Sequence, residues 1–498
     1  MTSTTAIAIG VLLAVILYKC LIYPYYLSPL SNVPNAHFTS PISTRWIERQ
    51  RNAGKEVLTL YDLHQTLGPV VRLGPDELSV NSLSGLKTIY TGAFEKHSFY
   101  SDVFVNFQTP NLVGMLHNTP HARQKRMISR IYSKSYLQES QDLRDISSIV
   151  LSQRLFPILR RIAKSGEAIN VLPLFQAVGM DFTSSYLFGT QNSTEYIFHL
   201  PEWQQWLDEF EKFKYLSVQD RYMGFIENWC LSLCRKVQNN DQPNDVPIAT
   251  NAVVYNQLRQ SLEKDPDNRP LELAIASEIL DHLVAGHETS GITFTYMMWE
   301  LSQHPELQAE LRRELLTLTP NLRSLSISDD TRGLVSLPSP SAVDALPLLD
   351  AVLRETLRLH SPAPAPLPRV TPASPTGVSI DGFQNIPAGV KVSSSAYSLH
   401  RIEEVYPQSS DWLPQRWLEA GPDKIHNMRR LFWPFGSGGR MCLGSNFALQ
   451  EIKLVMAAVY TNFTTSIIDD EGIEQDHAFI SLPIGRKLML KFTPVEDA

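Results

Sequence analysis

One segment near the C-terminal end of the 498-residue chain combines residue types that can hold a metal-bearing ligand. It reads Phe435-Gly-Ser-Gly438-Gly-Arg440-Met-Cys442-Leu-Gly444, and an apolar, helix-prone run follows it. A cysteine at a helix N-terminus is stabilised as a thiolate by free backbone N–H groups and by the helix dipole. The glycines let the backbone approach a flat ligand closely. The pattern therefore predicts a thiolate ligand at Cys442; a buried structural cysteine beside a glycine turn is the alternative.

A second candidate site lies within a long helical pattern, at residues 283–290 (Leu-Val-Ala-Gly-His-Glu-Thr-Ser). A glycine inside a helix costs roughly 1 kcal/mol relative to alanine, so Gly286 requires a physical reason. We expect a local widening of the helix, in which the Thr289 hydroxyl bonds to the carbonyl near Ala285 and opens a groove for O₂ and water. A kink-stabilising threonine beside a surface glutamate, Glu288, is the alternative interpretation.

A third pattern is a carboxylate and a guanidinium one helical turn apart, Glu355 and Arg358. This spacing alone says little, because most such pairs are surface bridges worth well under about 1 kcal/mol. The segment Trp412-Leu-Pro-Gln-Arg416-Trp417 downstream gives the pair its context.

Together these segments resemble the cytochrome P-450 monooxygenases. Residues 435–444 match every defining position of the family's haem-binding loop, Phe-x-x-Gly-x-Arg-x-Cys-x-Gly, and residues 285–290 resemble its oxygen-activation segment. Residues 412–417 resemble its Pro-Glu-Arg-Phe element, with Gln415 and Trp417 in place of the usual glutamate and phenylalanine. The resemblance covers essentially the whole chain.

The resemblance implies a role for each of these residues. Cys442 would be the axial ligand of the iron of haem b, Thr289 would hydrogen-bond O₂, and Glu288 would relay protons. Arg416 would complete a buried network with Glu355 and Arg358 that holds the cysteine loop and does no chemistry.

Haem carries two propionates, and carboxylates in a half-buried site must be paired with cations. Arg440 and Arg369 match family positions for this task. His121 and Lys125 stand where many members carry Trp-x-x-x-Arg, although His121 could simply be a helix-start residue. The remaining positions predicted to bind the cofactor belong to the loop itself, Phe435 and Gly438.

The resemblance also implies an electron source outside the chain. Only 56 residues follow Cys442, and none forms a recognisable flavin-binding unit. An NADPH-dependent P-450 reductase is therefore the expected partner. Its candidate docking surface is a basic patch, and a merely solvated charged face is the alternative; the patch consists of Arg123, Lys125, Arg126, Arg130, Lys424, Arg429 and Arg430.

The positions that line the family's substrate pocket are apolar or small here, which predicts a lipophilic small molecule. They are Phe99, Tyr100, Phe104, Phe107, Val284, residues 363–367 and residues 479–482. The chain resembles microsomal fungal members of the family, so we expect its substrate to be a terpenoid, polyketide or alkaloid intermediate of secondary metabolism. A haem-thiolate isomerase or dehydratase acting without O₂, and a non-catalytic haem-binding membrane protein, remain as alternatives.

The N-terminal residues form an apolar segment that can cross a membrane. The stretch from Thr5 to Leu27 can span about 30 Å of hydrocarbon, with Lys19 at one interface. A cleaved signal peptide fits less well, because no positive charge precedes the run and no small-residue cleavage site follows it. Basic residues after the run place the body on the cytoplasmic side. We predict a single-pass endoplasmic reticulum anchor at residues 1–27 and one monooxygenase domain at residues 28–498.

The elements that must position these residues are mainly helical. Helical periodicity dominates from 115 to 315, whereas alternation within 68–81 predicts a short hairpin. Further predicted features are breaks at 191–194 and 239–245, an irregular loop at 319–341, short strands within 362–414, a proline-marked hinge at 28–34 and a C-terminal strand pair near 478–492. The fold class is mainly α with a small β region, the cytochrome P-450 fold, after one transmembrane helix.

Composition excludes some classes of partner and of structure. The formal charge of −7 carries no basic bias, which argues against nucleic acid as a partner. Four cysteines are too few for a disulfide framework, so Cys20, Cys230 and Cys234 are expected to pack as small hydrophobes.

Overall fold

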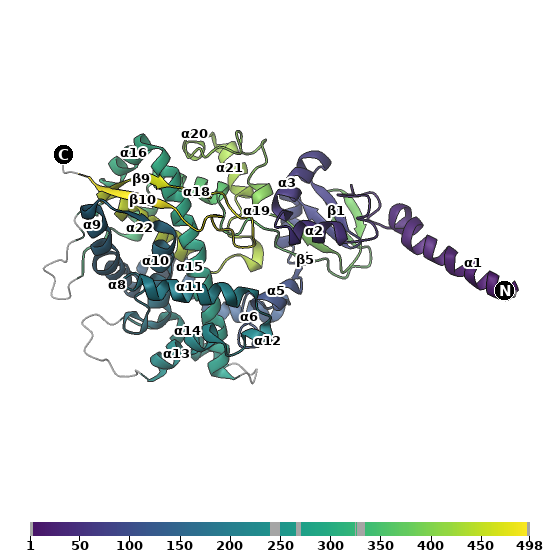
Figure 1. Cartoon of the computed structure of the whole chain (residues 1–498), viewed down its shortest axis with the longest axis horizontal. Coiled ribbons are helices and arrows are strands. Elements are labelled where there is room, and N and C mark those ends of the chain that lie inside the picture. Colours follow the sequence, from purple (N-terminus) through teal and green to yellow (C-terminus); the bar gives the residue numbers. More distant parts are fainter. Residues whose placement is uncertain (1–2, 240–249, 265–269, 324, 326–333, 496–498) are drawn as a thin grey trace.

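Helix α15 (Leu271–Gln303) is the longest helix of the described chain and lies in the middle of its helical part (Figure 1). The computed structural model describes residues 3–239, 250–264, 270–323, 325 and 334–495. Apolar and small residues occur all around α15, and most of the helix is buried. Helix α10 (Val171–Phe188) is buried along nearly its whole length and packs closely against α15.

The contact between α10 and α15 explains the glycine at position 286. A Cβ on Gly286 would overlap the side chain of Thr183 on α10, so the two backbones can approach only because the side chain is absent. The expected hydrogen bond from Thr289 Oγ1 to Ala285 O is present at 2.8 Å. The expected widening is not found, since α15 continues through residues 283–290 as α-helix. Close packing of α15 on α10 therefore accounts for Gly286.

Helices α6 to α16 confirm the helical character predicted for residues 115–315. Besides α10 and α15, they are α6 (Asn118–Ile128), α7 (Lys134–Glu139), α8 (Gln141–Ser148), α9 (Phe156–Ser165), α11 (Leu200–Tyr215), α12 (Val218–Arg221), α13 (Phe225–Asn239), α14 (Val253–Leu262) and α16 (Pro305–Leu315). The described helices outside this range are α1 (Ser3–Leu17), α2 (Arg45–Asn52), α3 (Glu56–Leu67), α4 (Leu83–Leu86), α5 (Phe99–Phe104), α17 (Pro340–Asp344), α18 (Pro347–Leu359), α19 (Ala396–Leu399), α20 (Arg416–Glu419), α21 (Pro422–Leu431) and α22 (Ser445–Asn462). Short 3-10 or π turns cover Tyr18–Leu27, Lys87–Thr91, Ser129–Tyr132, Ile149–Leu155, Thr190–Asn192 and Gly438–Arg440. The predicted break at 239–245, apart from residue 239, and the centre of the predicted loop at 319–341 lie outside the described residues.

A five-stranded sheet lies between the N-terminal helix and the helical part (Figure 1). Its order is β1-β2-β8-β5-β3, and its first two strands form the predicted antiparallel hairpin. The strands are β1 (Val70–Gly74), β2 (Glu77–Val80), β8 (Lys391–Ser393), β5 (Arg369–Val370) and β3 (Glu95–Lys96). Pairing of β3 with β5 sets Lys96 opposite Arg369.

The C-terminal strand pair differs from the predicted one. Strand β9 (Phe463–Asp469) pairs with β10 (Met489–Pro494), and β4 (Ala168–Asn170) pairs with the other edge of β10. The intervening chain contains turn residues, including Gly472 at φ +76°, and it approaches itself too closely there for a side chain. The prediction of strands near 478–492 was therefore wrong in its boundaries. A separate two-stranded ribbon joins β6 (Val378–Ile380) to β7 (Phe383–Ile386).

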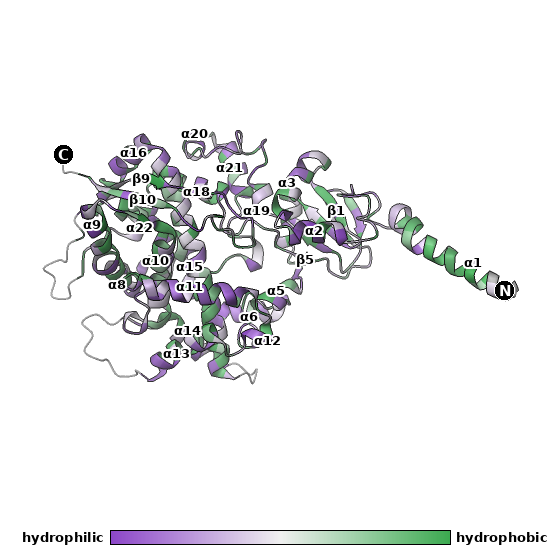
Figure 2. Cartoon of the chain, in the orientation of Figure 1, coloured by the Kyte–Doolittle hydropathy of each residue, from purple (hydrophilic) through white to green (hydrophobic). Residues whose placement is uncertain are grey.

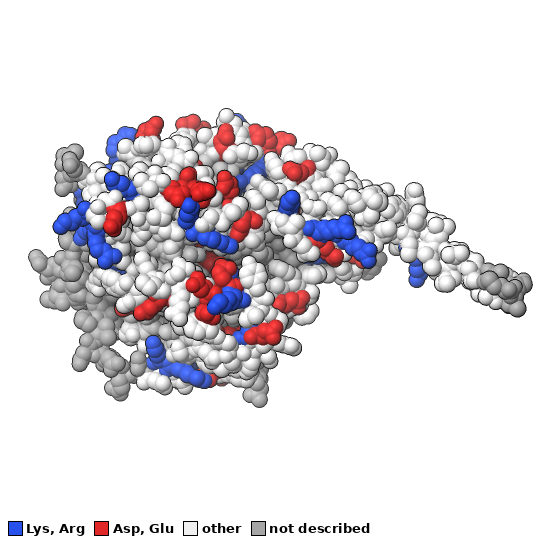
Figure 3. Space-filling view, viewed as in Figure 1, with Lys and Arg blue, Asp and Glu red and all other residues white. Residues whose placement is uncertain are grey.

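The N-terminal segment stands away from the body of the molecule (Figure 1). Residues 7–27 form the one described helical segment long and apolar enough to cross a membrane. Figure 2 shows its apolar colouring and Figure 3 its near lack of charged side chains. Cys20 is exposed on this segment, whereas Cys230 and Cys234 are buried in the core as expected.

The segment after this helix, predicted as a proline-marked hinge at 28–34, is packed against the sheet. Leu30 and Val33 are buried. The buried guanidinium of Arg72 on β1 donates to the carbonyl oxygens of Pro24 at 3.0 Å and Pro75 at 2.9 Å. This contact ties the end of the apolar segment directly to the sheet.

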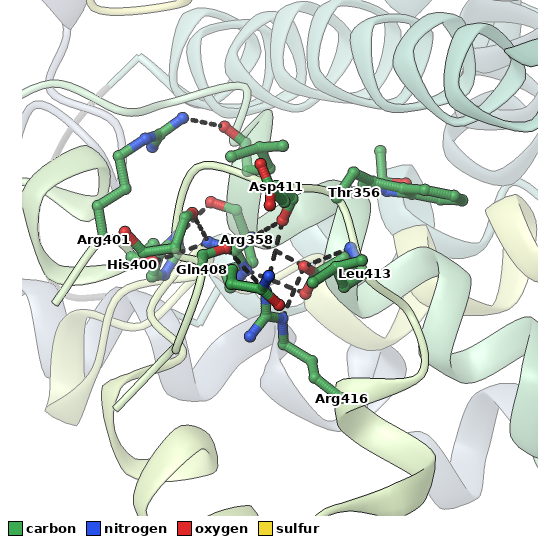
Figure 4. Close-up of polar contacts among 12 residues, drawn as sticks. Thr356, Arg358, His400, Arg401, Gln408, Asp411, Leu413 and Arg416 are labelled. Carbon is green, nitrogen blue, oxygen red and sulfur yellow. Dashed lines mark hydrogen bonds and ion pairs between the residues drawn. The ribbon is translucent and has the colours of Figure 1, made fainter. Parts of the chain in front are cut away.

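The predicted network around Glu355 is present (Figure 4), with Glu355 and Arg358 fully buried and Arg416 partly exposed. Glu355 accepts two hydrogen bonds from Arg358, at 2.8 and 2.9 Å, and one from Arg416 at 2.8 Å. The Leu413 N–H and the Trp417 indole N–H complete its coordination, at 3.0 and 2.8 Å. One carboxylate therefore joins α18 to the chain around residues 413–417.

His400 extends this network to the cysteine loop. Its Nδ1–H donates to Arg358 O at 2.9 Å, so Nε2 is free to accept from Trp433 N at 2.8 Å. The Trp433 indole N–H donates in turn to Ser437 Oγ at 2.9 Å. Burial lowers the pKa of His400 to about 3, which keeps the imidazole neutral for this double role.

Removing residues 1–27 should release much of the protein from the membrane fraction, because these residues supply the exposed apolar segment. Sedimentation after expression in yeast measures this. The full chain should resist carbonate extraction. Equal membrane retention of the truncated chain would contradict the assignment.

Replacing Glu355 with Gln should lower the free energy of unfolding by about 3–5 kcal/mol, because it leaves two guanidiniums without their counter-charge. Urea titration measures this, and Arg235→Gln, which removes an exposed ion pair, serves as the control with no resolved change.

The pH dependence of stability should change with the same substitution. Burial acts to raise the pKa of Glu355, but Arg358 and Arg416 together hold it below its ordinary value. Such a group stabilises the fold above its unfolded pKa of about 4.3 and loses that contribution as the pH falls through its folded pKa. Wild type should therefore lose more stability than Glu355→Gln between neutral and acid pH; parallel losses would contradict the network's role.

Candidate functional site

A large cavity lies between α15, α22 and the loop that carries Cys442. Its volume, including space open to solvent, amounts to about 1750 Å³, and its walls are mainly apolar. Of the residues predicted to bind or react, ten line it: His121, Thr289, Arg369, Phe435, Arg440 and Cys442, with Tyr100, Ala363, Leu367 and Phe479 from the substrate set. The cavity thus brings together residues from distant parts of the sequence.

The loop before Cys442 is held in a shape that only its glycines permit. Gly438 has φ +68°, and a Cβ there would overlap the carbonyl oxygen of Tyr90. The Cys442 N–H donates to Phe435 O at 2.9 Å, which closes the loop. Helix α22 begins at Ser445, so the thiol lies just before a helix N-terminus, as predicted.

The thiol of Cys442 faces the cavity, where its surface is exposed although the protein surrounds it. Burial raises the pKa of the thiol above its ordinary value, while the backbone N–H groups of Gly444 and Ser445 and the charge of Lys125 act to lower it. A bound metal cation removes the thiol proton outright. The environment therefore suits a metal-bound thiolate.

Lys125 on α6 contacts the cysteine loop itself. Its ammonium group donates to Gly439 O and Met441 O, at 3.0 Å each. In this position the cation caps two loop carbonyls and stays close to the sulfur of Cys442. His121, one turn earlier, is buried at the cavity wall, and burial together with Arg440 lowers its pKa to about 3.

Three cations gather at one edge of the cavity, and sequence reasoning missed one of them, Lys96. Arg440 donates to Met115 O and Leu116 O, at 2.6 Å each, while Arg369 donates to Tyr100 Oη at 3.0 Å. Burial and the two guanidiniums hold the pKa of Lys96 well below its ordinary value. Only the strand register that sets Lys96 opposite Arg369 could have identified it.

Thr289 and Glu288 are neighbours in sequence but point in different directions. Thr289 lines the cavity, together with Ala285 and Gly286. Glu288 is buried and turned toward α11, where Lys214 Nζ lies 3.0 Å from its Oε1. Burial raises the pKa of Glu288, although the charge of Lys214 opposes this shift. The alternative of a surface glutamate is therefore excluded.

A second buried carboxyl group in the cavity wall was also missed. Glu451 on α22 lies 3.5 Å from the Ser290 hydroxyl, which donates to its Oε2. Burial holds the pKa of Glu451 well above its ordinary value, and the Ser290 hydroxyl acts to lower it. Its position, nine residues after the cysteine, carries no local pattern that distinguishes it from a surface residue of an amphipathic helix.

The predicted substrate residues divide into two groups. Tyr100, Ala363, Leu367 and Phe479 line the cavity. Phe99 and Phe104 pack on Phe479, with ring centroids 5.4 and 5.3 Å away. Phe107 is not among the lining residues; its N–H donates to the buried Glu227 at 2.5 Å.

The cavity fits an iron porphyrin with two carboxylates. Cys442 supplies one soft anionic ligand, and the apolar walls suit a flat macrocycle. The three basic residues Lys96, Arg369 and Arg440 have no carboxylate hydrogen-bonded to them among the described residues, although Glu95 and Asp281 act on the cluster from a distance. Two propionates would supply such carboxylates.

Comparisons with known proteins agree with this geometry. The family model described as Cytochrome P-450 matches residues 39–490. The cytochrome P-450 monooxygenase avaI of Aspergillus versicolor is 30% identical over 406 residues, which cover 78% of this chain and 93% of that protein. The cytochrome P-450 monooxygenase tazI of Aspergillus terreus is 26% identical, with 98% of each chain covered. The cytochrome P-450 monooxygenase sdnE of Sordaria araneosa is 25% identical, with 96% of each chain covered. The chain therefore belongs to the cytochrome P-450 family of haem-binding monooxygenases.

Proposed function

We propose that this enzyme inserts one oxygen atom from O₂ into a lipophilic intermediate of fungal secondary metabolism, a terpenoid, polyketide or alkaloid. Electrons come from NADPH through a separate reductase, and the domain faces the cytoplasm from the endoplasmic reticulum membrane. The observation that carries this proposal is the single cavity that both Cys442 and Thr289 line, with Lys96, Arg369 and Arg440 also in its wall.

Each residue of the cavity then has a task in holding the cofactor. Cys442 ligates the iron through its sulfur, while the Gly444 and Ser445 N–H groups stabilise the thiolate. Arg369, Arg440 and Lys96 bind the propionates, with neutral His121 beside them. Phe435 and Gly438 shape the loop, and Lys125 clamps it through its carbonyls. When bound, haem supplies the binding and reductive activation of O₂.

Two side chains on α15 handle protons in this proposal. The Thr289 hydroxyl is bonded to Ala285 O and lies on the cavity wall, where it can donate to an oxygen ligand. The Glu288 carboxyl points away from the cavity toward α11, where it is paired with the partly exposed Lys214, and burial raises its pKa. Glu288 can thus collect protons from the surface for delivery toward Thr289.

Replacing Cys442 with Ser should abolish the red-shifted Soret band of the reduced protein under carbon monoxide, because that band requires a thiolate ligand. The absorption spectrum of the purified full chain measures this. Cys20→Ser, which removes an exposed thiol outside the cavity, should keep the band. A persistent band in Cys442→Ser would refute the ligand assignment.

Replacing Thr289 with Ala should raise the hydrogen peroxide released per NADPH oxidised several-fold, because O₂ activation loses a positioned hydrogen-bond donor. The measurement uses membranes that contain the enzyme and a P-450 reductase. Thr295→Ala is the matched control, since Thr295 makes the same type of bond, to Gly291 O at 2.8 Å, but is not among the residues that line the cavity.

The same experiment separates the proposed reaction from its alternatives. A wild-type enzyme that consumes no NADPH with the reductase would favour an isomerase or a non-catalytic haem protein. Equal peroxide release by wild type and Thr289→Ala would contradict the role of Thr289.

A further inference from the structure

One carboxyl group in the cavity wall has no task in the proposed reaction. Asp281 lies on α15 two turns before Thr289, and both side chains line the cavity together with Ala285. The spacing of i, i+4 and i+8 places them along one face of the helix, with about 12 Å of axial rise between the first and the last. Asp281 is therefore within reach of a substrate that extends away from the reaction centre.

Glu278, the neighbouring carboxylate on the same helix, has a structural role and serves as a comparison for Asp281. Glu278 is fully buried, and its Oε2 accepts from Leu112 N at 3.0 Å and from Gln124 Nε2 at 3.2 Å. Its other oxygen lies 3.4 Å from His282 Nε2. Glu278 thus holds the chain before α6 against α15, so this task does not require Asp281.

Asp281, by contrast, forms no hydrogen bond or ion pair with any residue that the structure describes. A buried or half-buried carboxylate without a partner is costly, so its presence calls for a ligand. Burial and the charge of Glu278 raise the pKa of Asp281 to about 7, while His282 and Lys96 oppose this shift. Lys96 donates to Val113 O at 2.7 Å and belongs to the cluster that we assign to the propionates.

We propose that Asp281 binds a basic nitrogen of the substrate, so that a protonated amine pairs with this carboxylate while the apolar remainder lies in the cavity. The proposal rests on the proposed function, because it places the substrate above a haem held by Cys442. It narrows the substrate from a lipophilic molecule to a lipophilic amine, and it favours the alkaloid among the three classes named above.

Two probes of the same shape test this assignment. 4-Phenylbutyltrimethylammonium carries a permanent cation that cannot coordinate iron, and 5,5-dimethylhexylbenzene is its neutral isostere. Binding to the detergent-solubilised, haem-loaded full chain is measured by calorimetry for wild type, Asp281→Asn and Asp281→Glu. Because each probe is compared across variants in one detergent, its partition into micelles cancels from the ratio.

Asp281→Asn should bind the ammonium probe about tenfold more weakly than wild type, the factor equivalent to one pKa unit between a carboxylate and a nearby cation. Its affinity for the neutral probe should stay unchanged. Asp281→Glu should restore part of the lost affinity because it restores the charge. Glu272→Gln, on the same helix but exposed and paired with Arg235, should bind both probes as wild type does.

The affinity for the ammonium probe should also rise from about pH 6 to about pH 8 in wild type, as the Asp281 carboxyl ionises. The charged or titratable groups that act on Asp281 are Glu278 and His282 on its own helix, Lys96 on β3 and, across the cavity, Cys442. All four remain in Asp281→Asn, in which the affinity should be flat over this range. The comparison therefore isolates the titration of Asp281.

Equal affinity of wild type and Asp281→Asn for the ammonium probe, including no binding to either, would overturn the proposal. So would a loss of turnover in Asp281→Asn without any change in ammonium affinity, which would make Asp281 a proton-handling residue. A chain that shows no red-shifted Soret band would instead refute the proposed function, so the two failures are distinguishable.

Discussion

The burial of a sulfur that would have to be an anion to bind a metal is the constraint on which the rest of this structure depends. Burial disfavours the anion at Cys442, and the backbone N–H groups of Gly444 and Ser445 and the ammonium group of Lys125 act against this penalty. Those N–H groups point at the sulfur only if the loop keeps its tight shape. Gly438 permits that shape, and the buried network of Glu355, through His400, holds the loop in place.

The basic groups, the thiol and the carboxyl groups of the cavity lie in different parts of its wall. Cations lie at the edge reached by β3 and β5, the thiol lies before α22, and two carboxyl groups, Asp281 and Glu451, lie on the helices that form the walls. Burial raises the pKa of Glu451 well above its ordinary value. With a pKa of about 7, the Asp281 carboxyl is close to half ionised at neutral pH, so a ligand in the cavity can shift its protonation.

Patterns contained within one short segment could be predicted from the sequence. The cysteine loop, the hairpin of β1 and β2 and the bond from Thr289 to Ala285 all depend on neighbours a few residues away. Features that depend on packing could not. Glu288 and Thr289 are adjacent, yet a turn of about 100° per residue separates their directions, and only the position of α11 decides that Glu288 meets Lys214. Lys96 likewise becomes a cavity residue through strand register alone.

The guanidinium of Arg72 has a mechanical consequence. It joins the end of the apolar N-terminal segment to β1, and the same sheet carries Lys96 and Arg369 at its other edge. The apolar N-terminal segment and the edge that we propose to bind the propionates are thus connected through hydrogen-bonded strands. We expect the two to move together when the segment is inserted in a membrane. The thickness and lateral pressure of the bilayer should then affect how tightly the cofactor is bound.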